Sequence, residues 1–255
     1  MPAPRPRGVD VFPAPRAGYE LLADVSVAQG PMGARLAGLR AAGVTGVLAR
    51  ATDGHSADTD WPETRDVCAA QGMPLSAYGV VEPGSDPVAQ AERFLAAVAR
   101  ATLARRCLDW EEARKQTGAQ AIQSAAAWVR TIHGATGAWP TVYTGPAFVE
   151  DLERLALRRD PETGFLTFDD STAEALAILA GCPLWCARWV EAFDRPDLHW
   201  PAAPAPWASA ELAQLTGGKA ALPGTTIPVD VTWGRRFDAR ATLQTGVTFT
   251  GETTP

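Results

Sequence analysis

Residues 74–111, PLSAYGVVEPGSDPVAQAERFLAAVARATLARRCLDWE, contain one complete strand–helix–strand unit. The apolar run 74–81 predicts a buried strand, and RCLDWE at 106–111 predicts a second one. Between them, Asp86 is a suitable N-cap for a helix that has Pro87 in its first turn. Because the connection between the two strands is helical, this unit predicts an α/β fold with a mostly parallel sheet.

Similar units extend from this stretch in both directions. On the N-terminal side, strands are predicted at 19–26 and 44–51, helices at 33–43 and 63–71, and a polar loop at 52–60. On the C-terminal side, helices are predicted at 118–133, 148–157 and 171–180, an insertion or hairpin at 160–170, and strands at 140–144, 183–189, 211–216 and 228–233. Repeated units that close on themselves predict a TIM-like (β/α) barrel, in which functional residues lie at the C-terminal ends of the strands.

The two ends of the chain differ in composition from this barrel region, 19–238. Residues 1–18 are rich in Pro and Arg and predict an extended arm, because Pro disfavours helix. Residues 239–255 form a Thr-rich tail, and the alternation in LQTGVTFTGE at 243–252 predicts an edge hairpin. The sequence therefore predicts one domain with an arm and a tail.

Composition limits the classes of function. With 255 residues, of which 46% are hydrophobic, the chain can bury the core of one large domain. Its formal net charge of -6 gives no basic bias toward nucleic acid. No apolar run is long enough to span a membrane, and the arm lacks the apolar region of a signal peptide. We expect no nucleic-acid partner, no stable membrane insertion, and synthesis in the cytoplasm unless export follows a route that the sequence hides.

The cysteines and histidines offer no metal motif. The four cysteines form no CxxC pair and are expected to be reduced and buried; they are Cys68, Cys107, Cys182 and Cys186. The three histidines match no motif and are interpreted as surface or core residues; they are His55, His133 and His199.

Four acidic residues lie at or near the ends of predicted strands: Asp24, Asp109, Glu111 and Asp230. Asp109 and Glu111 are two positions apart, so they point to the same side of their strand. Carboxylates that converge at one barrel mouth repel one another, which raises the pKa of at least one of them. A carboxylic acid that stays protonated near neutral pH can act as a general acid. Paired acids that flank a sugar are the usual machinery of glycoside hydrolysis.

Each acid taken alone also has a structural explanation, since an Asp at a strand end is often a helix N-cap or a turn former. A D-x-E pair such as Asp109 and Glu111 also suits a divalent metal. On spacing alone, a glycosidase and a metal site are equal alternatives.

Nine short motifs in order add a resemblance to a known family. They are D-V-S-x-x-Q-G at 24–30, R-A-T-x-G at 50–54, A-Y at 77–78, P-x-x-Q-A-x-x-F at 87–94, L-D-x-E at 108–111, P-x-V-Y-T at 140–144, L-W-x-A-R at 184–188, Q-x-T at 214–216 and V-D at 229–230. Over 24–237 the chain resembles glycoside hydrolase family 25, the Chalaropsis-type lysozymes of phages and bacteria. The resemblance implies an irregular (β/α) barrel, a groove across its strand ends, muramidase activity, and no metal or organic cofactor.

By this resemblance, Glu111 is the general acid/base, while Asp109 stabilises the developing positive charge or orients the N-acetyl group of the substrate. Asp24 and Asp230 are expected to tune Glu111 and to hold the sugar. Arg50 is expected to pair with an acid. Five further residues are expected to contact substrate in the groove: Tyr78, Tyr143, Trp185, Arg188 and Gln214. Packing is an equal alternative for Trp185, because Trp is highly buried on average.

Four positions depart from the family motifs: Gly79 stands for His, Trp189 and Leu215 for Tyr, and Thr232 for Asn. We expect these substitutions beside the sugar groove, where they affect substrate contacts, while the four acids favour activity. Asp10, in GVDV at 8–11, also resembles the opening motif but lacks its continuation, so Asp24 is preferred.

The partner that the resemblance implies is bacterial peptidoglycan, cut at the β-1,4 bond between N-acetylmuramic acid and N-acetylglucosamine. The four departures and the absent signal peptide motivate an alternative. It is a weak or inactive lysozyme-like domain that binds peptidoglycan or joins other proteins in a phage virion. A metal-dependent hydrolase is disfavoured because no His lies beside the acids. For an active enzyme, a cytoplasmic endolysin and a virion-delivered enzyme are both open.

Overall fold

The computed structural model describes residues 10–11, 16–33, 35–189, 196, 200–215, 220–221 and 228–235. The predictions for most of the arm, for the Thr-rich tail and its hairpin, and for His199 lie outside the described residues. Within the arm, the extended backbone at β1 (Asp10–Val11) pairs in parallel with β12 (Ala220–Ala221), a contact that the Pro-rich composition did not predict.

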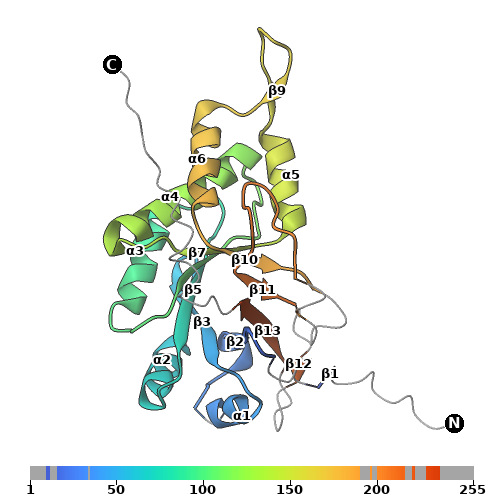
Figure 1. The fold of residues 1–255 in the computed structure, drawn as a ribbon. Coiled ribbons are helices and arrows are strands. Elements are labelled where there is room, and N and C mark those ends of the chain that lie inside the picture. Colours follow the sequence, from blue (N-terminus) through green and yellow to red (C-terminus); the bar gives the residue numbers. More distant parts are fainter. Residues whose placement is uncertain are drawn as a thin grey trace, which may run out of the picture.

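Eight strands form a closed barrel (Figure 1). In order around it they are β2 (Tyr19–Val25), β3 (Gly46–Asp53), β5 (Leu75–Val80), β6 (Arg106–Asp109), β7 (Thr141–Thr144), β10 (Leu184–Ala187), β11 (Leu212–Gln214) and β13 (Pro228–Arg235). All neighbours from β2 to β11 are parallel, whereas β13 runs antiparallel to both β11 and β2 and closes the ring. The predicted TIM-like barrel is confirmed, with one reversed strand.

The helices lie outside this ring, and Figure 1 shows α5 and α6 on the side opposite α1 and α2. They are η1 (Val27–Gln29), α1 (Leu36–Ala41), α2 (Trp61–Ala70), α3 (Pro87–Val98), α4 (Gly118–Thr136), α5 (Pro146–Ala156) and α6 (Asp170–Ala180). The predicted cap of α3 is confirmed, since Asp86 accepts hydrogen bonds from the backbone of Val88 and Ala89. The predicted hairpin at 160–170 is also present, as β8 (Arg158–Arg159) paired with β9 (Leu166–Thr167). The loop predicted at 52–60 contains the short strand β4 (Ser56–Ala57), which pairs with β3.

Strand alternation separates two apolar clusters. The larger one fills the space between the sheet and the helices, and it includes Phe94 of α3 and Trp128 of α4. The smaller one fills the barrel interior: Leu22, Leu48, Tyr78, Cys107, Tyr143, Trp185 and Leu212. All four cysteines are buried and free, as predicted. Among the described residues, no helix combines the length and the apolar character needed to cross a membrane.

Candidate active site

The four predicted acids lie at one end of the barrel. Asp24 is the second-last residue of β2, Asp109 is the last residue of β6, and Glu111 follows two positions later. Asp230 lies near the start of β13, and because that strand is antiparallel, its register places Asp230 directly opposite Asp24. The reversed closing strand therefore brings its first residues to the end where the parallel strands finish.

Asp24 is held by side chains from the barrel interior. The Gln214 Nε2 atom donates to Asp24 Oδ2 at 2.9 Å, and the Tyr78 hydroxyl donates to the backbone oxygen of the next residue, Val25, at 3.5 Å. Burial, and then the charges of Asp230 and Glu111, raise the pKa of Asp24 to about 8, against Tyr78 and Gln214, which lower it. Asp24 is therefore largely protonated at neutral pH.

Asp109 and Glu111 interact as a coupled pair. Burial raises the pKa of Asp109 well above its usual range, Glu111 and Asp24 raise it further, and Arg50 opposes the shift. Its Oδ1 atom is buried and has no hydrogen-bond partner among the described residues. Glu111 is more exposed, at the mouth, yet partial burial is still the largest cause of its raised pKa. The pair therefore retains a proton at a pH where an isolated carboxyl would have lost it.

Four of the five predicted groove contacts are largely buried in the barrel interior, and their contact with substrate stays a prediction. Tyr78, Tyr143, Trp185 and Gln214 are at most 7% exposed. The ring centroid of Trp185 lies 4.5 Å from that of Tyr143 and 6.1 Å from that of Tyr78, so packing describes Trp185 better than sugar contact. The Tyr143 hydroxyl donates to Gln214 Oε1 at 2.5 Å. These side chains lie behind the acids and hold them, whereas Arg188 is exposed just after β10.

The four departures from the family motifs do not all lie beside the acids. A side chain at Gly79 would meet Thr52 and Phe94, on the helix side of the sheet. Leu215 is buried in the outer core. By contrast, Thr232 is buried opposite Gln214 in the register. Trp189 is 66% exposed, and its Nε1 atom donates to Gln214 Oε1 at 3.3 Å. Only the last two adjoin the site, because strand alternation turns the other two outward.

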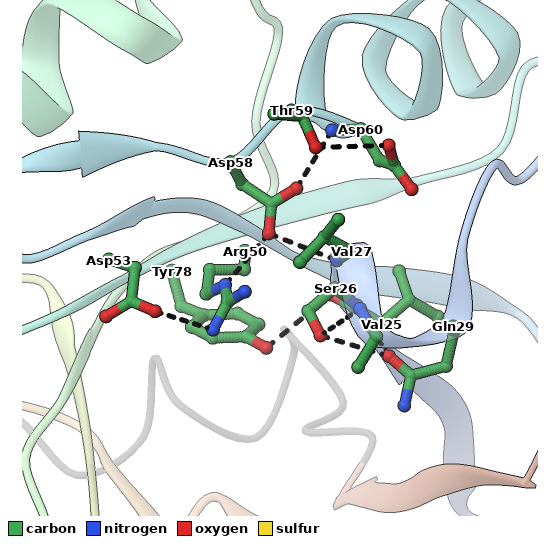
Figure 2. A network of polar contacts seen from close by, with 11 residues as sticks. Val25, Ser26, Val27, Gln29, Arg50, Asp53, Asp58, Thr59, Asp60 and Tyr78 are labelled. Carbon is green, nitrogen blue, oxygen red and sulfur yellow. Dashed lines mark hydrogen bonds and ion pairs between the residues drawn. The ribbon is translucent and has the colours of Figure 1, made fainter.

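Arg50 pairs with acids, as predicted, and its main partner is a residue that the sequence did not single out. Arg50 Nε lies 2.8 Å from Asp58 Oδ2, and Arg50 also pairs with Asp53 at 3.0 Å; Figure 2 shows both contacts. Asp58 Oδ2 also accepts from the Val27 backbone at 3.1 Å, and Asp58 Oδ1 accepts from the Asp60 backbone at 2.9 Å. Asp58 thus connects the loop after β3 to the turn that follows Asp24.

Residues of the opening motif D-V-S-x-x-Q-G form the hydrogen bonds that shape this turn (Figure 2). Ser26 caps η1 by accepting from the Ala28 backbone, and Gln29 Oε1 accepts from the Ser26 backbone at 2.8 Å. This capping box ends β2 at Val25, one residue after Asp24, and fixes the backbone that follows.

The two histidines that the structure describes make contacts away from the four acids. His55 contacts Ser85 and Glu82 on the surface, and His133 stacks on Trp139 with ring centroids 3.9 Å apart. In the part of the chain that the structure describes, no group of three or more His, Cys, Asp or Glu side chains that could hold a metal ion is found.

Solved structures with the same fold are lysozymes and related enzymes. A bacterial lysozyme from Streptomyces coelicolor shares 18% identity with a TM-score of 0.66, and the match covers 88% of this chain and 96% of that one. A muramidase from Acremonium alcalophilum shares 20% identity with a TM-score of 0.63, over 87% of this chain and 96% of that one. The catalytic domain of the endolysin ply40 from bacteriophage P40 of Listeria monocytogenes shares 19% identity with a TM-score of 0.59, over 86% and 94%. At these identities the likeness establishes the fold.

The family assignment has separate support from the sequence. The comparison with curated proteins gives no match. The family model of the glycosyl hydrolases family 25 matches residues 23–160, which is more than half of the chain and includes Asp24, Asp109 and Glu111. The chain therefore belongs to glycosyl hydrolases family 25.

Proposed function

We propose that this glycoside hydrolase is a muramidase, which cleaves the β-1,4 bond between N-acetylmuramic acid and N-acetylglucosamine in peptidoglycan. The observation that carries the proposal is the convergence of Asp24, Asp109, Glu111 and Asp230 at one barrel end, where burial and mutual repulsion raise carboxyl pKa values. Lysozyme, muramidase and endolysin structures with this fold support peptidoglycan as the substrate.

Glu111 is the general acid in this proposal. It is the most exposed of the three acids with a raised pKa, so a glycosidic oxygen can reach it. Its proton passes to that oxygen, the C1–O bond breaks, and the bonding electron pair leaves with the departing sugar. Positive charge then develops at C1 while the Asp109–Glu111 pair gains one negative charge, so the loss of the proton and the stabilisation of the cation are coupled.

Asp109 lies two positions before Glu111 at the same end of the barrel. In this proposal its carboxyl either stabilises the developing charge at C1 or orients the N-acetyl group of the bound sugar through its N–H. In the second case the carbonyl oxygen of the N-acetyl group attacks C1, and water later opens the resulting ring. The charge of Asp230 raises the pKa of Glu111 and so favours its protonated form, and Asp24 is proposed to hold the sugar.

Analysis of the digestion products tests the reaction. Purified peptidoglycan incubated with the enzyme should lose turbidity and release fragments that end in reducing N-acetylmuramic acid, identified by borohydride reduction and mass spectrometry. Fragments that end in reducing N-acetylglucosamine, or cleaved peptide stems, would overturn the proposed bond.

A second part of the proposal concerns how the enzyme reaches the cell wall. We infer that the protein acts as an endolysin, made in the host cytoplasm and acting on the wall from within, because a phage endolysin domain shares its fold. Detection of the protein in purified phage particles, next to other virion proteins, would instead assign it to the virion.

A further inference from the structure

A cavity of 220 Å³ lies at the end of the barrel opposite the acids. Its lining residues are the first residues of β6 and β7 or come shortly before β6, β7, β10 and β11, four strands that are neighbours in the sheet. Functional residues of a β/α barrel lie at the other end, where the parallel strands finish, so this cavity is separate from the proposed active site. The lining side chains that carry its chemistry are Arg105, Arg106, Trp139 and Glu211.

Trp139 gives this cavity an aromatic wall. The side chain is 38% exposed, and its indole ring stacks on the His133 imidazole with ring centroids 3.9 Å apart and the two planes at 14°. Because this stack covers one face of the indole, its exposed area belongs to the opposite face and the edges. A ring that is already held in place loses little conformational freedom when a ligand packs against it.

The two cations of the cavity differ in their hydrogen bonding. Arg105 pairs with Glu20 at 2.6 Å. The Nε atom of Arg106 is buried, and among the described residues it has no hydrogen-bond partner. A buried donor without a partner lowers the stability of the fold. A guanidinium kept in this state beside a cavity therefore points to a ligand that accepts its hydrogen bond.

The charges around the cavity balance, because Glu20 pairs with Arg105 and the carboxylate of Glu211 lines the same cavity as Arg106. Such a lining gives no net attraction for a free anion, and its charged groups disfavour a purely apolar ligand. It suits a neutral ligand whose hydroxyl and amide groups donate to a carboxylate and accept from a guanidinium. An N-acetylhexosamine has these groups, and the C–H face of its ring can lie against an indole.

We propose that this cavity is a second binding site for the glycan of peptidoglycan, in which Trp139 stacks on one N-acetylhexosamine ring while Arg106 and Glu211 bond its polar groups. The inference rests on the proposed function, which makes this glycan the substrate. Because the cavity and the acids lie at opposite ends of the barrel, the strand held here is not the strand being cut. A second point of attachment keeps the enzyme on the insoluble wall and raises the effective concentration of the next strand.

Indole N–H signals in a ¹H–¹⁵N NMR spectrum test the proposal without catalysis. The chain has nine tryptophans, and the variants Trp139→Phe and Trp189→Phe assign the signals of these two. Trp139 reports on the cavity, whereas Trp189, which donates to Gln214, reports on the barrel mouth beside the acids. Addition of tetra-N-acetylchitotetraose should shift the Trp139 signal.

Two outcomes would overturn the proposal. One is a Trp139 signal that stays unmoved at millimolar sugar, whatever Trp189 does. The other is a Trp139 signal that moves with inorganic phosphate but not with the sugar, which would make the cavity an anion site. Because the readout needs no turnover, an unmoved Trp139 signal in a protein that cleaves peptidoglycan refutes this site alone and leaves the proposed function standing.

Arg106→Met separates a binding role from a structural one. It keeps the apolar stem and removes the guanidinium, so it should weaken the binding seen at Trp139 by at least about tenfold, as expected when an anchor of a small site is lost. The urea midpoint should not fall, because the Nε atom has no partner to lose. A lower midpoint with unchanged sugar binding makes Arg106 structural and overturns its assignment.

Two further variants complete the test. Glu211→Gln keeps the shape of the side chain, should weaken the same binding, and replaces Arg106→Met if that variant folds poorly. Arg154→Met on α5 is the matched control, because its guanidinium pairs with Asp151 at 2.9 Å and does not line the cavity. It should leave the Trp139 response unchanged; an equal loss in both arginine variants would refute a specific role for Arg106.

Discussion

Asp58 should contribute more to the stability of the fold than any other single acid of the Arg50 network. Its side chain is 1% exposed and accepts from Arg50, from the Val27 backbone and from the Asp60 backbone. Asp53, the other partner of Arg50, has a side chain that is 54% exposed. Two carboxylates on one guanidinium thus differ in burial and in the backbone hydrogen bonds that only Asp58 accepts, and Asp58→Asn and Asp53→Asn compare the two.

The expected magnitudes follow from this difference. Removing one partner of a buried ion pair costs about 3–5 kcal/mol, because the remaining charge is left without compensation. Arg50 is 20% exposed and keeps Asp53, so we expect Asp58→Asn to lower the free energy of unfolding by about 2–3 kcal/mol, below that range. An exposed pair contributes roughly 0.2–1 kcal/mol, so Asp53→Asn should lower it by less than about 1 kcal/mol.

Urea unfolding at pH 7, followed by tryptophan fluorescence, measures both variants under the same conditions. Because Asp58 fixes the turn after Asp24, Asp58→Asn should also lower activity in the folded protein, whereas Asp53→Asn should not. Equal losses of stability in the two variants would refute the reasoning, since burial would then not decide the strength of the pair.

Three further predictions concern the acids. Glu111→Gln should reduce peptidoglycan hydrolysis by at least ~10²–10⁴-fold with an unchanged circular dichroism spectrum, and Asp109→Asn should also be severe; an unaltered rate for Glu111→Gln contradicts the assignment. Activity should survive excess EDTA, measured as turbidity loss, because the acids are proposed to act on protons and sugar charge; a large loss that added metal restores would make Asp109 and Glu111 ligands. Asp24→Asn should lower activity yet raise the free energy of unfolding. Because the pKa of Asp24 is raised in the folded protein, this gain in stability should grow from pH 4 to pH 8 in a series of denaturation experiments. A gain that is constant with pH contradicts the raised pKa.

The sequence predicts the fold and the position of the four acids at one end of the barrel, because both depend on local signals. Strand and helix periodicity, the cap at Asp86 and short motifs such as L-D-x-E are all read within a few residues. The roles of Tyr78, Tyr143 and Gln214 depend on which way a barrel strand faces and on contacts across the barrel. Gln214 and Asp24 are 190 positions apart in the sequence, so their hydrogen bond leaves no local signal. Asp58 was missed for the same reason, although three Asp residues in a loop beside Arg50 are a usable hint.

The raised pKa values that suit these acids to catalysis also make the free energy of unfolding depend on pH. The direction of this dependence follows from the direction of the pKa shifts. The pKa of Asp24 is about 8 in the folded protein, whereas an unperturbed Asp, as in the unfolded chain, has a pKa of 3.8, so the folded chain binds the proton more tightly than the unfolded chain does. The protonated carboxyl therefore favours folding fully below about pH 4, and this contribution is lost as pH rises through 8, at up to about 1.4 kcal/mol per pH unit. Asp109 and Glu111 shift in the same direction. The buried ion pair of Arg50 and Asp58 and the capping box of Ser26 and Gln29 offset part of that loss, because they fix the turn that follows Asp24.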